Sequence, residues 1–152
     1  ASCMIGFIVV SALIFGYFLT MSQVTQGIIN AVVGSGISPW SVIIFLVVMY
    51  IVLGFFMDII AILILTIPLV HPLIVQLGFD PVWFAVITIV VCEMGMVTPP
   101  LGMNVFVISK ATGIPVGTVF RGSFPHVIAH LIAVAILLAF PGLVMWLPNT
   151  MG

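Results

Sequence analysis

A lone carboxylate in a long apolar stretch is the first candidate for chemistry. Asp58 is the first charged side chain of the chain, so 57 residues precede it without Asp, Glu, Lys or Arg, and Gly54 lies one helical turn before it. An ionised carboxylate within lipid costs about 2.5–3.5 kcal/mol on insertion scales. We therefore expect Asp58 to contact or organise a bound ion, or to cap a helix by accepting from the amide of Ile60 or Ala61, and the two roles are compatible.

A pair of adjacent prolines is the second candidate. Pro99 and Pro100 remove two backbone donors and clash with the preceding turn, so a continuous helix through them is not expected. A helix broken at membrane depth frees carbonyl oxygens that coordinate Na⁺ and amides that favour anions. The alternative is a purely structural kink, but the polar and glycine residues around the prolines favour a binding site. The residues of this candidate site are Gly95, Thr98, Pro99, Pro100, Gly102 and Asn104.

The remaining polar residues give weaker signals. Glu93 could be a neutral buried acid, a proton carrier or an electrostatic partner of another segment. His126 and His130 are spaced i, i+4 and could seat a metal on one helix face, but the sequence offers no third ligand nearby. No nucleophile–base pair stands out. We therefore predict neither an enzyme nor a cofactor site.

The composition predicts a protein embedded in lipid. Charged residues make up 3% of the chain, against about 25% in soluble domains. Apolar residues make up 64% and the mean hydropathy is +1.57. The net charge of −1 leaves no basic face for nucleic acid. The chain starts at Ala1 with no basic segment before its first apolar run, so we expect it to be part of a longer protein.

These residues must be positioned by membrane helices. A spanning helix needs about 20 apolar residues. The apolar run in 1–23 predicts a transmembrane helix, and the glycine-containing segment 24–39 predicts an interfacial segment. A single helix over 40–77 would be about 57 Å long, far more than one crossing of a core about 30 Å thick. Because Asp58 lies mid-stretch with no polar loop around it, we predict a re-entrant helical hairpin of two half-depth helices for 40–77.

The second half of the chain begins with a surface turn, in which Asp80 is placed to cap a helix that starts with proline. We predict a discontinuous transmembrane helix over 81–110, with halves near 82–97 and 101–110. An interfacial arm helix is expected over 111–124 and a last transmembrane helix over 125–147. Basic residues flank the arm, which places it on the cytoplasmic side.

The order of these motifs resembles the large permease subunit of tripartite ATP-independent periplasmic (TRAP) transporters over essentially the whole chain. The run from Gly54 through Asp58 to Ala61 is similar to the second hairpin of that family. The run from Glu93 to Phe106, which contains the Thr-Pro-Pro-x-Gly-x-Asn string, is similar to its second broken helix. Two positions depart from the usual pattern: Ile59 where the family often has Pro, and Cys92 where Asn is frequent.

The resemblance implies an all-α integral membrane protein that forms the C-terminal inverted repeat of an elevator-type transporter. It implies Na⁺ as coupling ion, held between the hairpin tip, Gly54 to Asp58, and the adjacent break. Backbone carbonyls and the Thr98 hydroxyl would be the ligands, with the break made by Gly95, Thr98, Pro99 and Pro100. Gly102 and Asn104 would lie near the substrate chamber, and 111–124 would link transport domain to scaffold.

The resemblance also implies partners and a place in the cell. The expected partners are a small four-helix membrane subunit, a periplasmic substrate-binding protein and the N-terminal half of the large subunit. The protein would lie in the bacterial inner membrane and import organic acids such as C4-dicarboxylates or sialic acids. Two alternatives stay open: a proton-coupled carrier in which Asp58 or Glu93 titrates, and a non-transporting membrane assembly subunit.

Overall fold

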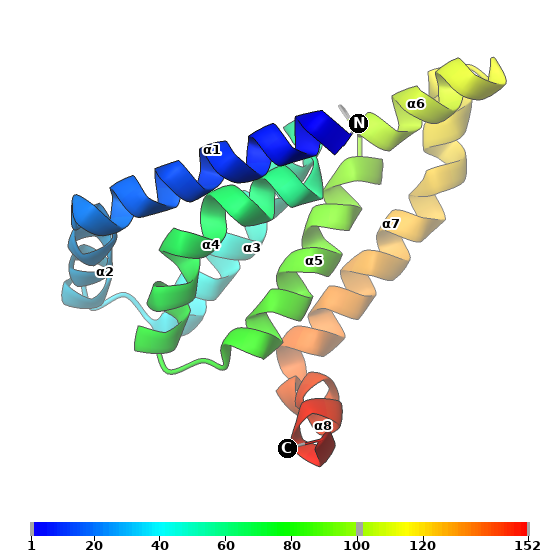
Figure 1. Ribbon diagram of the computed structural model, residues 1–152. Coiled ribbons are helices and arrows are strands. Elements are labelled where there is room, and N and C mark those ends of the chain that lie inside the picture. The colour runs from blue at the N-terminus through cyan, green and yellow to red at the C-terminus, as the bar shows by residue number, and fades with distance from the viewer. Residues whose placement is uncertain (1, 100–101, 152) are drawn as a thin grey trace.

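The computed structural model describes residues 2–99 and 102–151, and the regular secondary structure of this part of the chain is entirely α-helical (Figure 1). Three of its helices, α3, α4 and α7, are long and apolar enough to cross a membrane. The bent pair formed by α1 and α2 would add a fourth crossing if the pair is one span. The expected all-helical membrane architecture is therefore confirmed at this level.

The first two helices meet at a bend. Helix α1 covers Ser2–Met21 and α2 covers Val24–Gly34. Gln23 between them has a φ of 54°, a left-handed conformation that few residues other than glycine adopt, and the two axes differ by 62°. The chain thus turns sharply at the polar residues that follow the first apolar run.

The next two helices form a hairpin. Helix α3 covers Pro39–Phe56, α4 covers Ile59–Gln76, and only Met57 and Asp58 separate them. Each arm has 18 residues and is therefore about 27 Å long. Each arm is thus longer than the half-depth helix expected from the sequence, and its length and composition would suffice for a full crossing. A re-entrant path through the membrane stays a prediction.

The third pair of helices is separated by the double proline. Helix α5 covers Pro81–Val97 and α6 covers Met103–Thr112. Helix α5 begins where the sequence indicates, because an Asp80 carboxylate oxygen accepts from the amides of Val82 at 2.8 Å and Trp83 at 3.2 Å. Thr98, which follows α5, is extended, and this ends the helix before the prolines.

The C-terminal helices differ from the sequence prediction. Helix α7 is one 24-residue helix, Val116–Ala139, with Pro125 in its interior, and α8 follows over Pro141–Met151. The expected boundary between an arm helix 111–124 and a last helix 125–147 is therefore wrong. Pro125 removes one helical hydrogen bond, but α7 packs against both α5 and α6. Continuing the helix keeps the other backbone groups bonded in an apolar environment.

The hairpin and the broken helix form the centre of the fold. Helix α3 packs mainly against α5, whereas α4 packs mainly against α1, and α7 covers the other side of α5 (Figure 1). Helices α3 and α5 run in the same direction, because Trp40 lies near Trp83 and Gly54 lies against Gly95. The tip of the hairpin and the C-terminal end of α5 therefore lie at the same end of the bundle.

An aromatic cluster holds the opposite end together. The rings of Trp40, Phe79 and Trp83 lie 5.3 to 6.0 Å from one another. The indole Nε1–H of Trp83 donates to the carbonyl oxygen of Leu137 at 3.0 Å, which ties α5 to α7. Trp83 is only 1% exposed, so this polar atom is bonded in the interior.

We predict that Trp83→Phe loosens the α5–α7 contact while the aromatic stacking persists. The substitution removes the indole donor and leaves the Leu137 carbonyl unpaired, which should lower the free energy of unfolding by about 1–3 kcal/mol. Thermal unfolding of the complete permease measures this. Trp146→Phe is the matched control, because Trp146 is 69% exposed. Equal melting temperatures for the two variants would contradict the prediction.

Candidate functional site

Two glycines bring the hairpin and the broken helix into backbone contact. A Cβ atom built on Gly95 would lie 2.8 Å from the Cα of Gly54 and 2.8 Å from the carbonyl oxygen of Ile51. A Cβ on Gly54 would lie 2.8 Å from the carbonyl oxygen of Cys92. Both glycines are buried. The main chains of α3 and α5 therefore touch two residues before the end of each helix.

The hairpin tip lies directly beyond this contact. Met57 is extended, with φ −129° and ψ 152°, and its amide donates to Leu53 at the end of α3. An Asp58 carboxylate oxygen accepts from the amide of Ile60 at 3.1 Å, and Asp58 is exposed. The predicted capping role of Asp58 is thus confirmed with Ile60 as donor, and its contact with an ion stays a prediction.

We predict that the capping role and the charge of Asp58 can be separated by two substitutions. Asp58→Ala removes the cap and should lower the free energy of unfolding by about 1 kcal/mol, whereas Asp58→Asn retains an oxygen that caps equally well. Thermal unfolding of the complete permease compares the two variants. If Asp58→Asn destabilises as much as Asp58→Ala, the cap is not what Asp58 contributes to stability.

Thr98 replaces one of the two hydrogen bonds that the prolines remove. In a continuous helix the carbonyl of Gly95 would accept from residue 99, but Pro99 has no N–H. The amide of Thr98 donates to that carbonyl instead at 3.2 Å. The Thr98 hydroxyl donates to the carbonyl oxygen of Met94 at 2.6 Å. Because the hydroxyl acts as a donor here, its lone pairs remain able to coordinate a cation.

Gly102 lies against two carbonyl oxygens of the break. A Cβ atom at Gly102 would lie 2.8 Å from the Met96 carbonyl oxygen and 3.0 Å from that of Thr98. The carbonyl of Met96 has lost its helical partner, since residue 100 is a proline without an N–H. The Thr98 carbonyl accepts from the amide of Gly102 at 3.1 Å. Only a residue without a side chain fits this position without moving these oxygens.

The structure places the predicted site residues at one end of the bundle. Gly54 and Gly95 touch, and Thr98 and Gly102 follow within the break. Asn104 lies in the first turn of α6 and is exposed. Pro99 is exposed, and the prediction for Pro100 lies outside the described residues.

One link between the hairpin arms was missed by the sequence analysis. The Tyr50 hydroxyl donates to Thr66 Oγ1 at 2.8 Å, and the Thr66 hydroxyl donates to the carbonyl oxygen of Ile62 at 2.8 Å. Thr66 thus bonds both to its own helix and to Tyr50, and no local pattern in the sequence connects these two residues. Both residues lie eight positions from Asp58, one on each arm, and this symmetry about the tip is a signal that could have found the pair.

The other polar residues do not join the site. Glu93 is an exposed residue of α5 between buried Cys92 and Met94. The rings of His126 and His130 lie 4.4 Å apart on α7, and His130 Nδ1 is 3.1 Å from the carbonyl oxygen of His126. Within residues 2–99 and 102–151, no three His, Cys, Asp or Glu side chains are grouped so that they could hold a metal ion.

Comparison with known proteins identifies relatives along almost the whole chain. The family described as "Tripartite ATP-independent periplasmic transporter, DctM component" matches residues 1–143. The C4-dicarboxylate TRAP transporter large permease protein DctM of Pseudomonas aeruginosa is 34% identical over 98% of this chain and 35% of its own length. Its counterpart in Vibrio cholerae is 32% identical over 96% of this chain and 32% of its own length.

A third relative has another substrate in its name. The sialic acid TRAP transporter permease protein SiaT of Haemophilus influenzae is 27% identical over 95% of this chain and 24% of its own length. The chain thus spans about a third or less of the relatives it matches. The match over residues 1–143 includes both the hairpin and the broken helix. The chain therefore belongs to the DctM family of TRAP transporter large permeases, which are multi-pass transport proteins of the bacterial inner membrane and not enzymes.

Proposed function

We propose that this chain forms one half of the ion-binding and substrate-binding core of a sodium-coupled importer of organic acids. The observation that carries the proposal is the backbone contact between Gly54 and Gly95. It brings the hairpin tip and the helix break together, so that the ends of two helices meet at one place. Helix ends at membrane depth are where secondary transporters bind their ions and substrates.

The coordinating groups would be oxygens of the break. The carbonyl oxygens of Met96 and Thr98 converge on Gly102, and the Thr98 hydroxyl lies in the same segment. Hard cations such as Na⁺ prefer neutral and anionic oxygen ligands. Asp58, one turn after Gly54, would add a negative charge close to the bound ion. Gly54, Gly95, Pro99 and Pro100 would shape the site without contributing side-chain ligands.

The substrate would bind beside the ions, at the start of α6. The first amides of a helix lack helical partners and carry partial positive charge, which suits a carboxylate. Gly102 is the N-cap residue of α6 and Asn104 lies in its first turn, and these are the residues we assign to the substrate. The names of the relatives mention C4-dicarboxylates and sialic acid, both organic acids. A similar substrate class is proposed for the complete protein.

The remaining part of the site would come from other segments and subunits. Because the chain spans about a third of its relatives, the N-terminal part of the permease would supply the opposite wall of the substrate chamber. A small four-helix membrane subunit would extend the scaffold, and a periplasmic binding protein would deliver the substrate. Transport would proceed by an elevator movement of the hairpins and broken helices together.

Uptake by the complete transporter in proteoliposomes tests this proposal. We expect that replacing external Na⁺ by K⁺ at constant pH abolishes uptake of the organic acid. Full uptake without Na⁺ that stops when the proton gradient is collapsed would favour the proton-coupled carrier instead, with Asp58 or Glu93 as the titrating group. A correctly assembled complex that takes up no organic acid under either gradient would favour the assembly subunit.

A further inference from the structure

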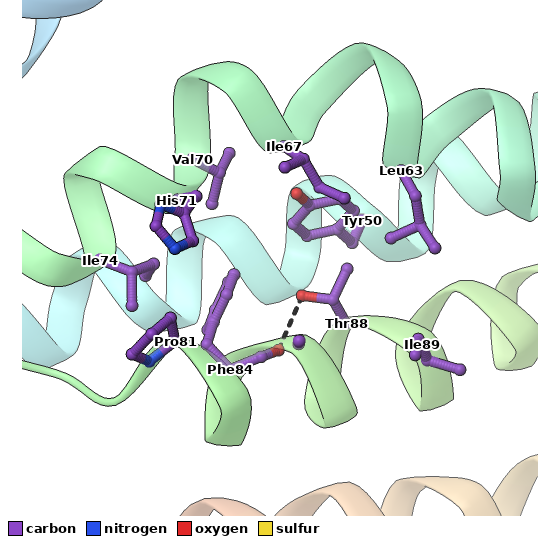
Figure 2. A pocket seen from close by; sticks show the side chains of 11 residues that line it. Tyr50, Leu63, Ile67, Val70, His71, Ile74, Pro81, Phe84, Thr88 and Ile89 are labelled. Carbon is purple, nitrogen blue, oxygen red and sulfur yellow. Dashed lines mark hydrogen bonds between the residues drawn. The ribbon is translucent and has the colours of Figure 1, made fainter. Parts of the chain in front are cut away.

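A cavity of about 200 Å³ lies between α4 and α5, away from the helix break. Figure 2 shows His71 and Pro81 at one end of the cavity and Leu63 and Ile89 at the other, with Tyr50 of α3 between them. An apolar cavity of about 150 Å³ in another protein is large enough to bind benzene. The space between α4 and α5 is therefore large enough for a hydrocarbon group.

The hydroxyl groups of the cavity wall are already engaged within the protein. Tyr50 donates to Thr66, and Thr88 donates to the carbonyl oxygen of Phe84 at 2.9 Å, as Figure 2 shows for the second bond. The rest of the interior wall is aliphatic or aromatic. A polar ligand would lose its hydrogen bonds to water here and would find no free hydroxyl donor in the interior wall. The interior therefore selects an apolar occupant.

The length of the cavity matches one leaflet of a bilayer. It extends along α4 from Ile74 to Leu63, which is about 16 Å of helix. Half of the hydrocarbon core is about 15 Å thick. The Ile74 end lies next to the turn 78–80 between α4 and α5, which ends at the carboxylate of Asp80. The cavity thus begins beside Asp80, and its length equals the depth to which one acyl chain enters the hydrocarbon core.

The mouth of the cavity has the chemistry of a lipid headgroup site. His71 is exposed and lies at the polar end, where its imidazole can donate to a phosphate oxygen. Ile67 and Ile89, which are 50% and 44% exposed, extend this apolar surface away from His71, toward the far end of the cavity. Helix α4 has the length and composition of a membrane span, so a hydrocarbon group suits this exposed apolar edge.

We propose that this cavity is a phospholipid site, which holds one acyl chain between α4 and α5 and the phosphate of the same lipid near His71. The apolar interior wall selects a hydrocarbon group, and the length of the cavity fits one acyl chain. The imidazole of His71 provides the contact with the headgroup. The site is distinct from the ion and substrate site at the break, and it does not depend on the coupling ion. A segment of the rest of the permease is the competing occupant.

Photolabelling of the complete transporter tests the site. The protein is reconstituted in phosphatidylethanolamine–phosphatidylglycerol vesicles that contain a trace of phosphatidylcholine with a diazirine in the middle of one acyl chain. After illumination, peptides are mapped by mass spectrometry. We expect adducts on Ile67, Ala85 or Ile89. Ala85→Phe fills the cavity and should lower this labelling about tenfold, the factor expected when about two methylene groups are kept out of an apolar site.

Matched variants make the outcome decisive. Ala129→Phe makes the same change on the exposed surface of α7 and should leave the cavity labelling unchanged. Ala85→Val is a smaller change that should give a partial decrease even if Ala85→Phe does not fold, and elution on size exclusion reports folding. The proposal is overturned if folded wild-type protein carries no adduct at the cavity. It is also overturned if labelling is the same in Ala85→Val and wild type, or if Ala85→Cys cross-links to another segment of the permease.

Discussion

Gly95→Ala is expected to abolish most uptake by the complete transporter, because the new methyl group has no space. Its Cβ would lie 2.8 Å from the Cα of Gly54 and from the carbonyl oxygen of Ile51. These are backbone atoms of a packed helix, so neither can rotate away, and α3 and α5 must separate. Overpacking of this kind lowers the free energy of unfolding by about 1–3 kcal/mol. The displacement acts directly on the hairpin tip and the helix break.

A second glycine provides the control for this prediction. Gly122 lies in α7, and a Cβ there would meet nothing within 4 Å. Gly122→Ala should be neutral or stabilise the helix by up to about 1 kcal/mol, since alanine favours helices. Both variants are compared by initial uptake rate and by melting temperature. Uptake by Gly95→Ala at the level of Gly122→Ala would contradict the proposed role of the contact.

The contact also predicts coupling between its two members. Gly54→Ala alone should destabilise the protein for the same steric reason, because its Cβ would lie 2.8 Å from the Cys92 carbonyl oxygen. Once one substitution has separated α3 and α5, the Cβ atom of the second alanine has more space and clashes less with the facing backbone. The double variant should therefore lose clearly less stability than the sum of the two single variants. Strict additivity would show that the glycines act independently.

Gly102→Ala is expected to weaken Na⁺ binding with a smaller effect on folding. The new Cβ would lie 2.8 Å from the Met96 carbonyl oxygen and 3.0 Å from that of Thr98, the oxygens assigned to the ion. Moving them from the site should raise the Na⁺ concentration for half-maximal uptake about tenfold, which corresponds to about 1.4 kcal/mol of binding free energy. The dependence of uptake rate on Na⁺ concentration measures this shift directly.

The matched control for this substitution is Gly117→Ala. Gly117 lies in the first turn of α7 as Gly102 lies at the start of α6, but a Cβ at Gly117 would meet nothing within 4 Å. Its Na⁺ dependence should equal that of the wild type. If Gly102→Ala leaves the Na⁺ dependence unchanged while the protein folds normally, the carbonyls of the break do not hold the ion.

Local chemistry explains why much of this fold could be predicted. Asp80 and Pro81 mark the start of α5, and α5 ends at Val97, two residues before the first of the two adjacent prolines. Asp58 caps α4 because a carboxylate placed just before a helix accepts from its first amides. Each of these outcomes depends on residues within one or two turns, so the sequence alone determines them.

Tertiary packing explains what could not be predicted. Pro125 normally indicates a helix start, but α7 continues through it because packing against α5 and α6 stabilises the longer helix. The close approach of Gly54 and Gly95 depends on how α3 and α5 are aligned, and no local pattern specifies that alignment. The Tyr50–Thr66 bond depends in the same way on the alignment of the two hairpin arms.

The most direct test of the central claim is the thermal stability of the purified, complete permease in NaCl compared with KCl at equal concentrations. A ligand that binds only the folded state raises the melting temperature by mass action, and the increase grows with ligand concentration. We predict that NaCl raises the melting temperature progressively, that KCl does not, and that Gly102→Ala reduces the increase. Identical melting curves in the two salts would contradict the claim that the hairpin tip and the helix break form a sodium site.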